Sequence, residues 1–255
     1  KNARIFNIFW QIQVLNNIVH DMNYVASACV PGRRYLPFYI GSGTNLTFTG
    51  NETYGNGGGW QFYPGPITNA TITKNYIHDE TNCTNQNVGG ILVQASSGNI
   101  SGVSIYDNII ETIGTVGNTQ QASVLDLGPS SGSFTQTGTT VYNNTIYNSA
   151  TGYGIVIRAK ASGTILKNNI ITGSALGAIL NAGVSTTMTY NACTAGETCT
   201  TANKTTIAAI TDCVVSTSNF TLKASSSCIG VGTSVSTRSS GNGTQDIGTY
   251  EAPLF

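Results

Sequence analysis

The stretch TVYNNTIYNS, residues 140–149, carries the pattern that decides the fold of this 255-residue chain. Related phrases recur along the sequence: VLNNIVHDM, ITKNYIHDE, SIYDNIIET and ILKNNIITGS. Aligning them on one asparagine gives a column whose members lie 22 to 36 residues apart. Its members are Asn17, Asn51, Asn75, Asn108, Asn144, Asn169 and Asn191.

The residues on both sides of this asparagine column are mostly apolar. Three positions earlier stand Val14, Phe48, Ile72, Ile105, Val141, Leu166 and Met188. Two positions later stand Val19, Thr53, Ile77, Ile110, Ile146, Ile171 and Cys193. A further short apolar phrase, such as GIVIR, precedes the asparagine in several repeats. Each repeat therefore predicts two or three short strands separated by turns of Gly, Ser and Asn.

Constant strands joined by turns of variable length are typical of a solenoid, because only the stacked positions of each rung must repeat. Rungs of such a coil stack about 4.8 Å apart. We expect the column asparagines to occupy a left-handed turn and to hydrogen-bond from rung to rung. A second turn with positive φ is predicted six residues before six of them, at Asn45, Asn69, Gly102, Gly138, Gly163 and Ser185.

Over about residues 10–195, these phrases resemble the right-handed parallel β-helix proteins of the pectin-lyase-like superfamily. The tail phrases FTLKASSSCIGVG and DIGTYE are similar to a closing module of many such proteins, although Ser227, Cys228 and Gly230 replace its usual Pro, Ala and Asp. The resemblance implies an all-β, single-stranded right-handed solenoid of about seven rungs over residues 1–215. Residues 216–255 would close it, packed on the last rungs. Carbohydrate-facing biology is implied, without a choice of reaction.

The charge composition excludes two classes of partner. Only 9% of residues are charged, with 11 basic and 11 acidic side chains and no basic run. Nucleic acid and anionic membranes both require a positive footprint, so neither is expected as a partner. No apolar stretch approaches the roughly 18 residues of a membrane span.

Six cysteines without CxxC spacing favour disulfides in an oxidising compartment, either extracellular or at the cell surface. The expected pairs are Cys193–Cys199, Cys213–Cys228 and Cys29–Cys83. The last pair needs long turns to close, because its members belong to repeats two rungs, or about 9.6 Å, apart.

Nine Asn-x-Ser/Thr sequons accompany the cysteines. The column places Asn51 inside, so we expect it to carry no sugar. Outward turns should present the remaining candidates for glycosylation, which are Asn45, Asn69, Asn82, Asn99, Asn143 and Asn203.

The first functional hypothesis is a polysaccharide lyase or glycoside hydrolase. The outward ends of successive strands are expected to align Gln94, Asp126, Arg158 and Asn181 as a carbohydrate-contacting row. Catalysis there would fall to Arg158, Lys160 and Asp126. However, the row holds one carboxylate, whereas glycoside hydrolysis uses a pair about 5 to 9.5 Å apart. The simpler alternative is a surface ion pair of Asp126 and Arg158, worth roughly 0 to 1 kcal/mol.

A metal site is not expected, because the two His-Asp pairs are too far apart. His20 and His78 share one offset from their column asparagines and should lie about 9.6 Å apart if Asn51 starts a full rung. One zinc ion needs nitrogen ligands at roughly 2.0 to 2.1 Å. No cofactor is predicted from any other pattern.

A threonine face is a second hypothesis, as in proteins that bind ice or crystals. Thr47-x-Thr49, Thr71-x-Thr73 and Thr187-x-Thr189 share their offsets from the column. Tyr106 and Lys167 interrupt the same positions in other rungs. Threonine is also a common strand residue, which weakens this interpretation.

The favoured hypothesis is a non-catalytic extracellular β-helix with a structural or adhesive role, such as a subunit of a surface fibre, sheath or appendage. A rung-like phrase begins within about ten residues of the first residue, and no amphipathic helix is available to cap that end. Open strand edges invite pairing. We therefore expect self-association or an adjoining domain there, with glycans as further partners. The enzyme and the carbohydrate- or ice-binding module stay open as alternatives.

Overall fold

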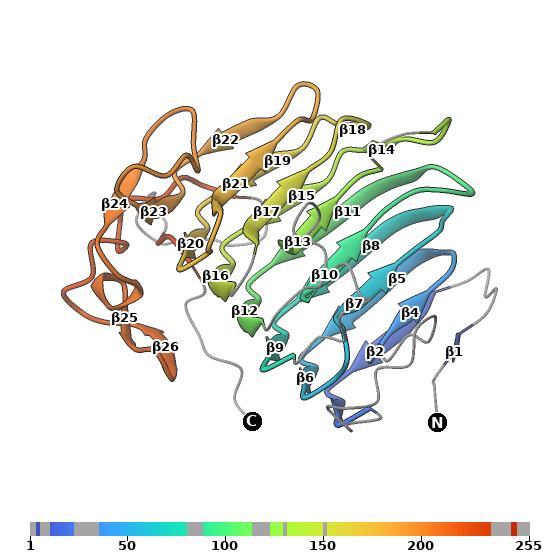
Figure 1. The fold of residues 1–255 in the computed structure, drawn as a ribbon, viewed down its shortest axis with the longest axis horizontal. Coiled ribbons are helices and arrows are strands. Elements are labelled where there is room, and N and C mark those ends of the chain that lie inside the picture. The colour runs from blue at the N-terminus through green and yellow to red at the C-terminus, as the bar shows by residue number, and fades with distance from the viewer. Residues whose placement is uncertain are drawn as a thin grey trace.

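The computed structural model describes residues 4–5, 11–22, 36–80, 89–113, 123–129, 132–149, 152–235 and 246–248. Within them, three sheets of parallel strands run along one axis, and each strand pairs with its counterparts in the neighbouring turns of the chain. Figure 1 shows these strands side by side as successive steps of a solenoid. The fold is therefore the predicted parallel β-helix. No helix in this described part is long and apolar enough to cross a bilayer.

Each sheet is ordered along the axis by rung. The first sheet holds β1 (Arg4–Ile5), β4 (Tyr39–Ile40), β7 (Trp60–Phe62), β10 (Ile91–Val93), β13 (Ser123–Leu127), β17 (Tyr153–Ile157) and β21 (Gly177–Asn181). The second holds β2 (Gln13–Leu15), β5 (Gly43–Thr49), β8 (Ile67–Thr73), β11 (Ile100–Tyr106), β15 (Thr140–Tyr142), β19 (Ile165–Lys167) and β22 (Thr187–Thr189), with short β14 (Gln136–Thr137) and β18 (Ala161–Ser162). The third holds β3 (Ile18–His20), β6 (Glu52–Tyr54), β9 (Tyr76–His78), β12 (Ile109–Ile113), β16 (Thr145–Ser149), β20 (Ile170–Thr172), β23 (Ala192–Thr194) and β24 (Thr205–Ile207).

The strand register confirms both apolar columns. Val14 pairs with Phe48 and Phe48 with Ile72, and the column continues unbroken to Met188. Val19 begins the second column, which runs to Cys193. Over the described residues these columns define seven rungs, as predicted.

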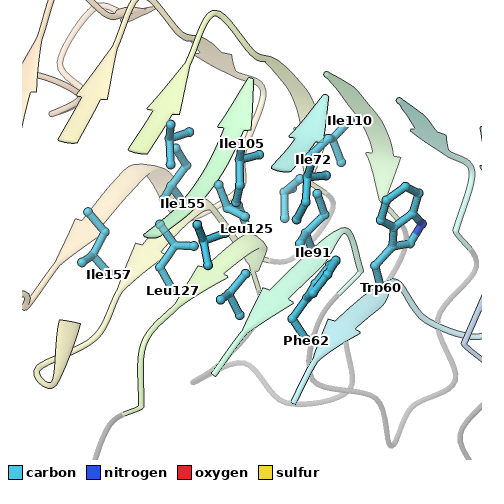
Figure 2. Packing of buried hydrophobic residues seen from close by; sticks show 14 of the residues in the cluster. Trp60, Phe62, Ile72, Ile91, Ile105, Ile110, Leu125, Leu127, Ile155 and Ile157 are labelled. Atoms are coloured by element: carbon cyan, nitrogen blue, oxygen red, sulfur yellow. The ribbon is translucent and has the colours of Figure 1, made fainter. Parts of the chain in front are cut away.

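The core is a narrow apolar stack enclosed by the three sheets. Leu166 and Ile110 are fully buried in it, as is every other residue of the first column from Phe48 to Val141. Figure 2 shows Ile72 and Ile105 stacked from rung to rung and facing Ile91 and Leu125 of the first sheet. Burial of such side chains stabilises the fold by about 1.5 to 3 kcal/mol each.

The asparagine column forms a continuous ladder at the turn between the second and third sheets. From Asn51 onward, each Oδ1 accepts two hydrogen bonds from the asparagine of the previous rung, one from its backbone N–H and one from its Nδ2, at 2.9 to 3.1 Å. From Asn51 onward the ladder side chains are buried. A buried amide without a hydrogen-bond partner is destabilising. The hydrogen bonds along the ladder therefore allow a column of polar side chains beside the apolar core.

The expected backbone geometry of the ladder is wrong by one residue. The left-handed conformation belongs to the residue before each ladder asparagine, as in Gly50 (φ 67°) and Lys74 (φ 54°), and not to the asparagine. The residue with positive φ turns the backbone, and the side chain of the asparagine that follows it then points along the solenoid axis. The second predicted turn is confirmed, because all six expected residues have positive φ, including Asn69 (56°) and Gly138 (64°).

The described residues from 208 onward pack against the outer face of the third sheet. A short helix η1 (Ile210–Asp212) leads into an antiparallel pair of strands, β25 (Val214–Ser216) and β26 (Asn219–Leu222). Figure 1 shows this pair beside the end of the solenoid that carries β23 and β24. Apolar residues of this segment cover outward side chains of the third sheet. The segment contributes Ile210, Val214, Phe220 and Ile247, and the sheet contributes Ile109, Ile170 and Ala192. We call the described residues from 208 onward the C-terminal module.

Contacts between the two tail phrases hold this module together. The backbone N–H of Gly230 donates to Asp246 Oδ1 at 2.8 Å, and that of Ile247 donates to the Cys228 carbonyl at 2.8 Å. Gly248 N–H donates to the carbonyl of Asn168 in the ladder turn.

Two of the predicted disulfides are confirmed. Cys193 bonds to Cys199 with 6.2 Å between Cα atoms, and Cys213 bonds to Cys228 with 5.3 Å. The first pins a turn after β23, and the second links η1 to the tail. The third predicted pair, Cys29 and Cys83, lies outside the described residues.

Candidate functional site

The predicted carbohydrate-contacting row on the first sheet does not form. Asp126 pairs in register with Leu92 and Val156, whereas Asn181 pairs with Ile157. Arg158 follows Ile157, so it stands two positions beyond the partner of Asp126. The prediction aligned the residue that ends each apolar phrase. Because loops of different length precede the strands of this sheet, these residues do not occupy equivalent strand positions.

Asp126 and Arg158 form a buried ion pair, so their interpretation as a surface pair is also wrong. Arg158 Nε donates to Asp126 Oδ1 at 2.6 Å, and a second guanidinium nitrogen donates to Oδ2. The two residues are 1% and 9% exposed. Burial raises the pKa of Asp126, and the Arg158 guanidinium opposes that shift. The pair is an internal clamp between β13 and the end of β17.

The surroundings of this pair leave it inaccessible to a polymer. The outward residues that share its register, Gln61, Leu92 and Val156, are also buried. Lys160, the other candidate catalytic residue, is exposed and lies beyond this buried face. The structure therefore does not bring Arg158, Lys160 and Asp126 together as an exposed site.

The threonine columns of the second sheet are in register as predicted. Thr47 pairs with Thr71, and Thr49 pairs with Thr73. In the following rungs Ser104 and Tyr106 take their places, and Ser104 Oγ accepts a hydrogen bond from Thr140 at 3.0 Å. Aromatic rings break the regular spacing of methyl and hydroxyl groups that a flat lattice-matching face needs.

Aromatic and acidic side chains gather on the outer face of the third sheet. His20, Tyr54 and His78 occupy one register position in three successive rungs. Their rings stack, with centroids 4.8 Å apart for His20 and Tyr54 and 5.1 Å apart for Tyr54 and His78. The rung of Tyr54 therefore separates the two histidines, as predicted from their offsets.

His78 is held at both ring nitrogens. Its Nδ1 lies 2.9 Å from Asp79 Oδ2, and its Nε2 lies 3.0 Å from Glu52 Oε1 on the neighbouring strand. The ring of Tyr76 stacks on it at 4.0 Å. These contacts fix the orientation of the imidazole between two rungs.

Tyr76 extends the same network to the next rung. Its hydroxyl donates to a carboxylate oxygen of Glu111, which is 7% exposed. Burial raises the pKa of Tyr76, and the hydrogen bond to Glu111 and the charges of Glu111, Asp79 and Glu52 raise it further. The phenol therefore keeps its proton and acts as a fixed donor. We call His20, Glu52, Tyr54, Tyr76, His78 and Glu111 the third-sheet strip.

The strip occupies the part of the third sheet next to the C-terminal module. Tyr76 and Tyr147 pack against the apolar cluster of that module, and Tyr147 lies 6.2 Å from the ring of Phe220. Within the strip, the side chain of His20 is 47% exposed, whereas those of His78 and Glu52 are 14% and 16% exposed and Glu111 is buried. Asp21 and Asp79, which follow the two histidines, are 58% and 62% exposed.

Sequence reasoning found the two histidines but missed the residues that join them. Glu52 and Tyr76 stand one position after their ladder asparagines, and Tyr54 and His78 stand three positions after. Positions one and three of a strand share a face, so this grouping was readable from the aligned phrases. Glu111 also stands three positions after its ladder asparagine, but this offset alone does not identify it as a partner of Tyr76.

The charge of the strip is mainly negative. Glu52 and Glu111 within the strip, and Asp21 and Asp79 beside it, contribute carboxylates, and the outward positions of β3, β6 and β9 hold no Lys or Arg. Lys74 is exposed in the turn that precedes β9. Across the described residues, no group of three or more His, Cys, Asp or Glu side chains is arranged to hold a metal ion.

Some sequon asparagines have exposed side chains and others have buried ones, and the prediction for one of them is wrong. Asn45 and Asn69 are exposed on adjacent rungs, and Asn69 Nδ2 donates to Asn45 Oδ1 at 3.2 Å. Asn99 and Asn203 are also exposed, and Asn51 is buried in the ladder. The outward orientation expected of Asn143 is wrong: its side chain is fully buried in the left-handed turn before Asn144.

Asn82, the remaining candidate for glycosylation, lies outside the described residues.

Comparison with protein families gives one match. Residues 9–186 match the family model described as the right handed beta helix region. The match includes the first six of the seven ladder asparagines, and it agrees with the predicted handedness. Neither the curated proteins nor the solved structures that were compared contain a match to this chain.

Proposed function

Because the chain belongs to the right-handed β-helix family, we propose that it is an extracellular, non-catalytic module that adheres to glycans through the third-sheet strip. The observation that carries this proposal is the stacked row of His20, Tyr54 and His78, in which each histidine contacts the aspartate that follows it and His78 also contacts Glu52 of the neighbouring rung. Two disulfides favour an oxidising environment, which supports the extracellular assignment.

The spacing of the strip suits an extended polymer of sugars. Its rings repeat once per rung, and the rung spacing of about 4.8 Å is close to the length of one pyranose unit in an extended chain. Because the rings stack on one another, they present edges and polar tips to solvent. Recognition would therefore rely mainly on hydrogen bonds to sugar hydroxyls, and the half-exposed ring of His20 offers some additional surface for a pyranose ring.

Fixed polar groups reduce the entropic cost of binding. The Glu52–His78–Asp79 contacts and the Tyr76–Glu111 hydrogen bond hold donors and acceptors in place before a ligand arrives. The negative charge of the same groups disfavours polyanions. Neutral glycans are therefore the proposed ligands, in preference to polyuronates.

The proposal can be tested by calorimetric titration of the purified protein with neutral oligosaccharides and with a polyuronate oligomer. We expect binding of at least one neutral oligosaccharide and weaker binding of the uronate. Tyr54→Ala and His78→Ala should each weaken binding about tenfold, which corresponds to roughly 1.4 kcal/mol. Tyr106→Ala on the second sheet is the matched control and should bind like the unmodified protein, because Tyr106 has similar burial but lies on another face.

A parallel assay of new reducing ends addresses catalysis. The strip contains two carboxylates, Glu52 and Glu111, which is the observation that keeps a glycoside hydrolase as the alternative. Turnover of an oligosaccharide that is abolished by Glu111→Gln would establish that alternative and overturn the non-catalytic role. Absence of binding to the whole neutral panel would overturn adhesion through this strip.

A further inference from the structure

The C-terminal module contains a sequon that is not among the predicted glycosylation sites. Asn219, Phe220 and Thr221 form an Asn-x-Thr sequence at the start of β26. They lie in the second strand of the β25–β26 hairpin, beside the end of the solenoid (Figure 1). Whether this sequon can carry a sugar depends on where its asparagine points and on what its amide contacts.

Alternation along β26 fixes the direction of the sequon side chains. Phe220 is 2% exposed, and its ring lies 6.2 Å from that of Tyr147 on the third sheet. Asn219 and Thr221, on either side of it, are exposed. Because successive side chains of a strand point to opposite faces, the inward Phe220 holds both sequon side chains on the outer face of the hairpin.

The side-chain amide of Asn219 uses only its oxygen within the described protein. Its Oδ1 accepts a hydrogen bond from the backbone N–H of Thr221 at 3.1 Å. In the part of the chain that the structure describes, its Nδ2 donates to no acceptor. An N-linked sugar replaces one hydrogen of Nδ2 and leaves the carbonyl oxygen unchanged. The contact with Thr221 therefore persists in a glycosylated chain.

The buried ladder shows the opposite arrangement. Asn51 Nδ2 donates to Asn75 Oδ1 at 3.0 Å and to the Val14 carbonyl at 2.9 Å. Both hydrogens of this amide are thus committed, and its side chain is buried. A sugar on Asn51 would break a ladder contact, whereas a sugar on Asn219 replaces a hydrogen that no described residue receives.

The surroundings of Asn219 leave room for an oligosaccharide. Ser216 pairs with Asn219 across the hairpin, and the two residues of the turn between them, Thr217 and Ser218, are exposed. Val215, on the neighbouring strand, is 52% exposed. A sugar on Asn219 would therefore begin beside the turn and extend into solvent over the outer face of the hairpin.

We propose that Asn219 is an N-glycosylation site whose glycan shields the turn of the β25–β26 hairpin from proteases. In the transfer, Nδ2 of Asn219 attacks C1 of the first sugar of a lipid-pyrophosphate-linked oligosaccharide. The new bond from Nδ2 to C1 replaces the bond from C1 to a phosphate oxygen. The lipid pyrophosphate leaves, and a base of the transferase takes the Nδ2 proton. This site shares only the secreted, extracellular setting with the proposed function and does not depend on glycan binding by the third-sheet strip.

The turn beside Asn219 is the reason for the protective role. Exposed turns of small polar residues are preferred sites of proteolytic cleavage, and Thr217 and Ser218 form such a turn. A cut there would divide the hairpin whose inward side chains cover Ile109 and Ile170 on the third sheet. A glycan on the next residue would obstruct the approach of a protease to this turn.

A matched pair of variants tests the modification. Thr221→Ser keeps the sequon and Thr221→Ala removes it, although both shorten the same exposed side chain. The full chain and both variants are expressed through a eukaryotic secretory pathway and analysed by site-by-site mass spectrometry. We expect sugar on Asn219 in the unmodified protein and in Thr221→Ser, and none in Thr221→Ala. A bare Asn219 in the unmodified protein would overturn the proposal.

Limited digestion of the folded proteins with a protease of broad specificity tests the shielding. Cleavage between residues 215 and 221 should be at least about fivefold slower in the glycosylated protein than in Thr221→Ala. An endoglycosidase that leaves one sugar on the asparagine provides a second glycan-free form with an unchanged sequence, and its cleavage should be as fast as that of Thr221→Ala. Equal rates in the glycosylated and trimmed forms would overturn the protective role.

Thermal unfolding tests whether the amide of Asn219 keeps its contact. Because the Oδ1 hydrogen bond persists, glycosylated Thr221→Ser should not unfold more than about 2 °C below Thr221→Ala. A larger drop would show that the sugar displaces part of the hairpin, and it would contradict the outward orientation of Asn219.

Discussion

Asn108 Oδ1 accepts two hydrogen bonds from Asn75, one from its backbone N–H at 3.0 Å and one from its Nδ2 at 2.9 Å. Asn108 passes the same pair on to Asn144 and also donates to the Ile72 carbonyl at 2.9 Å. One side chain therefore supports the rungs on both sides of it, as the other internal asparagines of the ladder do.

Asn108→Ala should destabilise the protein by about 3 kcal/mol or more, because two buried donors of Asn75 lose their acceptor. Urea denaturation followed by circular dichroism measures the change. Asn181→Ala is the control, since Asn181 is exposed and its hydrogen bonds are local, and it should stay within about 0.5 kcal/mol. Equal losses in the two variants would contradict a special role for the ladder.

Arg158→Ala should cost roughly 3 to 5 kcal/mol, since it leaves the buried Asp126 carboxylate without its cation. The loss should shrink in acid, where protonation removes the unpaired charge. Lys160→Ala, two residues away and exposed, should change stability little. Denaturation at neutral and acidic pH compares them, and a neutral-pH loss below about 1 kcal/mol would restore the interpretation as a surface pair.

Glu80→Gln should remove a pH dependence of stability. Burial raises the pKa of Glu80 from 4.5 to about 8, against the opposing effect of donors from Asn56 and Thr53. The folded state thus holds this proton more tightly than the unfolded chain does. Its contribution is complete below about pH 4.5 and is lost as the pH rises through about 8.

Unfolding free energies at pH 5, 7 and 9 measure this slope. The Gln variant should be flatter over that range and more stable than the unmodified protein at pH 9. Asp21→Asn is the control, because Asp21 is an exposed carboxylate in an equivalent turn with positive φ. An unchanged slope in Glu80→Gln would place the titration elsewhere.

Glycan occupancy should follow the direction of each sequon. After expression through a eukaryotic secretory pathway, Asn45, Asn69, Asn99 and Asn203 should carry sugar, since their side chains are exposed. Asn51 and Asn143 should be bare, because neither has room for a sugar in the folded chain. Site-by-site mass spectrometry decides this, and full occupancy of Asn51 would contradict the buried ladder.

The repeating columns were readable in the sequence because each inward position faces the same neighbours in every rung. Val141 and Leu166 must be apolar wherever the coil places them, and Asn144 must be an amide wherever a ladder passes. The positive φ of Gly138 was equally local in origin. The turn at the asparagine ladder was misassigned by one residue. The sequence does not indicate whether Asn143 or Asn144 has the positive φ.

The outward positions were harder to predict, because what covers them comes from elsewhere in the chain. Asp126 looked exposed from its place at the end of an apolar phrase, yet it is 1% exposed. Ile109 gave no sign that the C-terminal module would lie over it. The third-sheet strip was partly visible in the offsets of His20 and His78, but the contacts of Glu52 and Glu111 depend on neighbouring rungs.

The sideways packing of the C-terminal module bears on the order in which the chain can fold during synthesis. Ladder and core can grow one rung at a time as residues emerge, since each rung needs only the one before it. The outward apolar row that contains Ile109 and Ile170 is different, because its covering residues, such as Phe220 and Ile247, are translated long after it. A nascent solenoid therefore exposes an apolar flank until the C-terminal module has left the ribosome, and shielding by a chaperone would matter most over that interval.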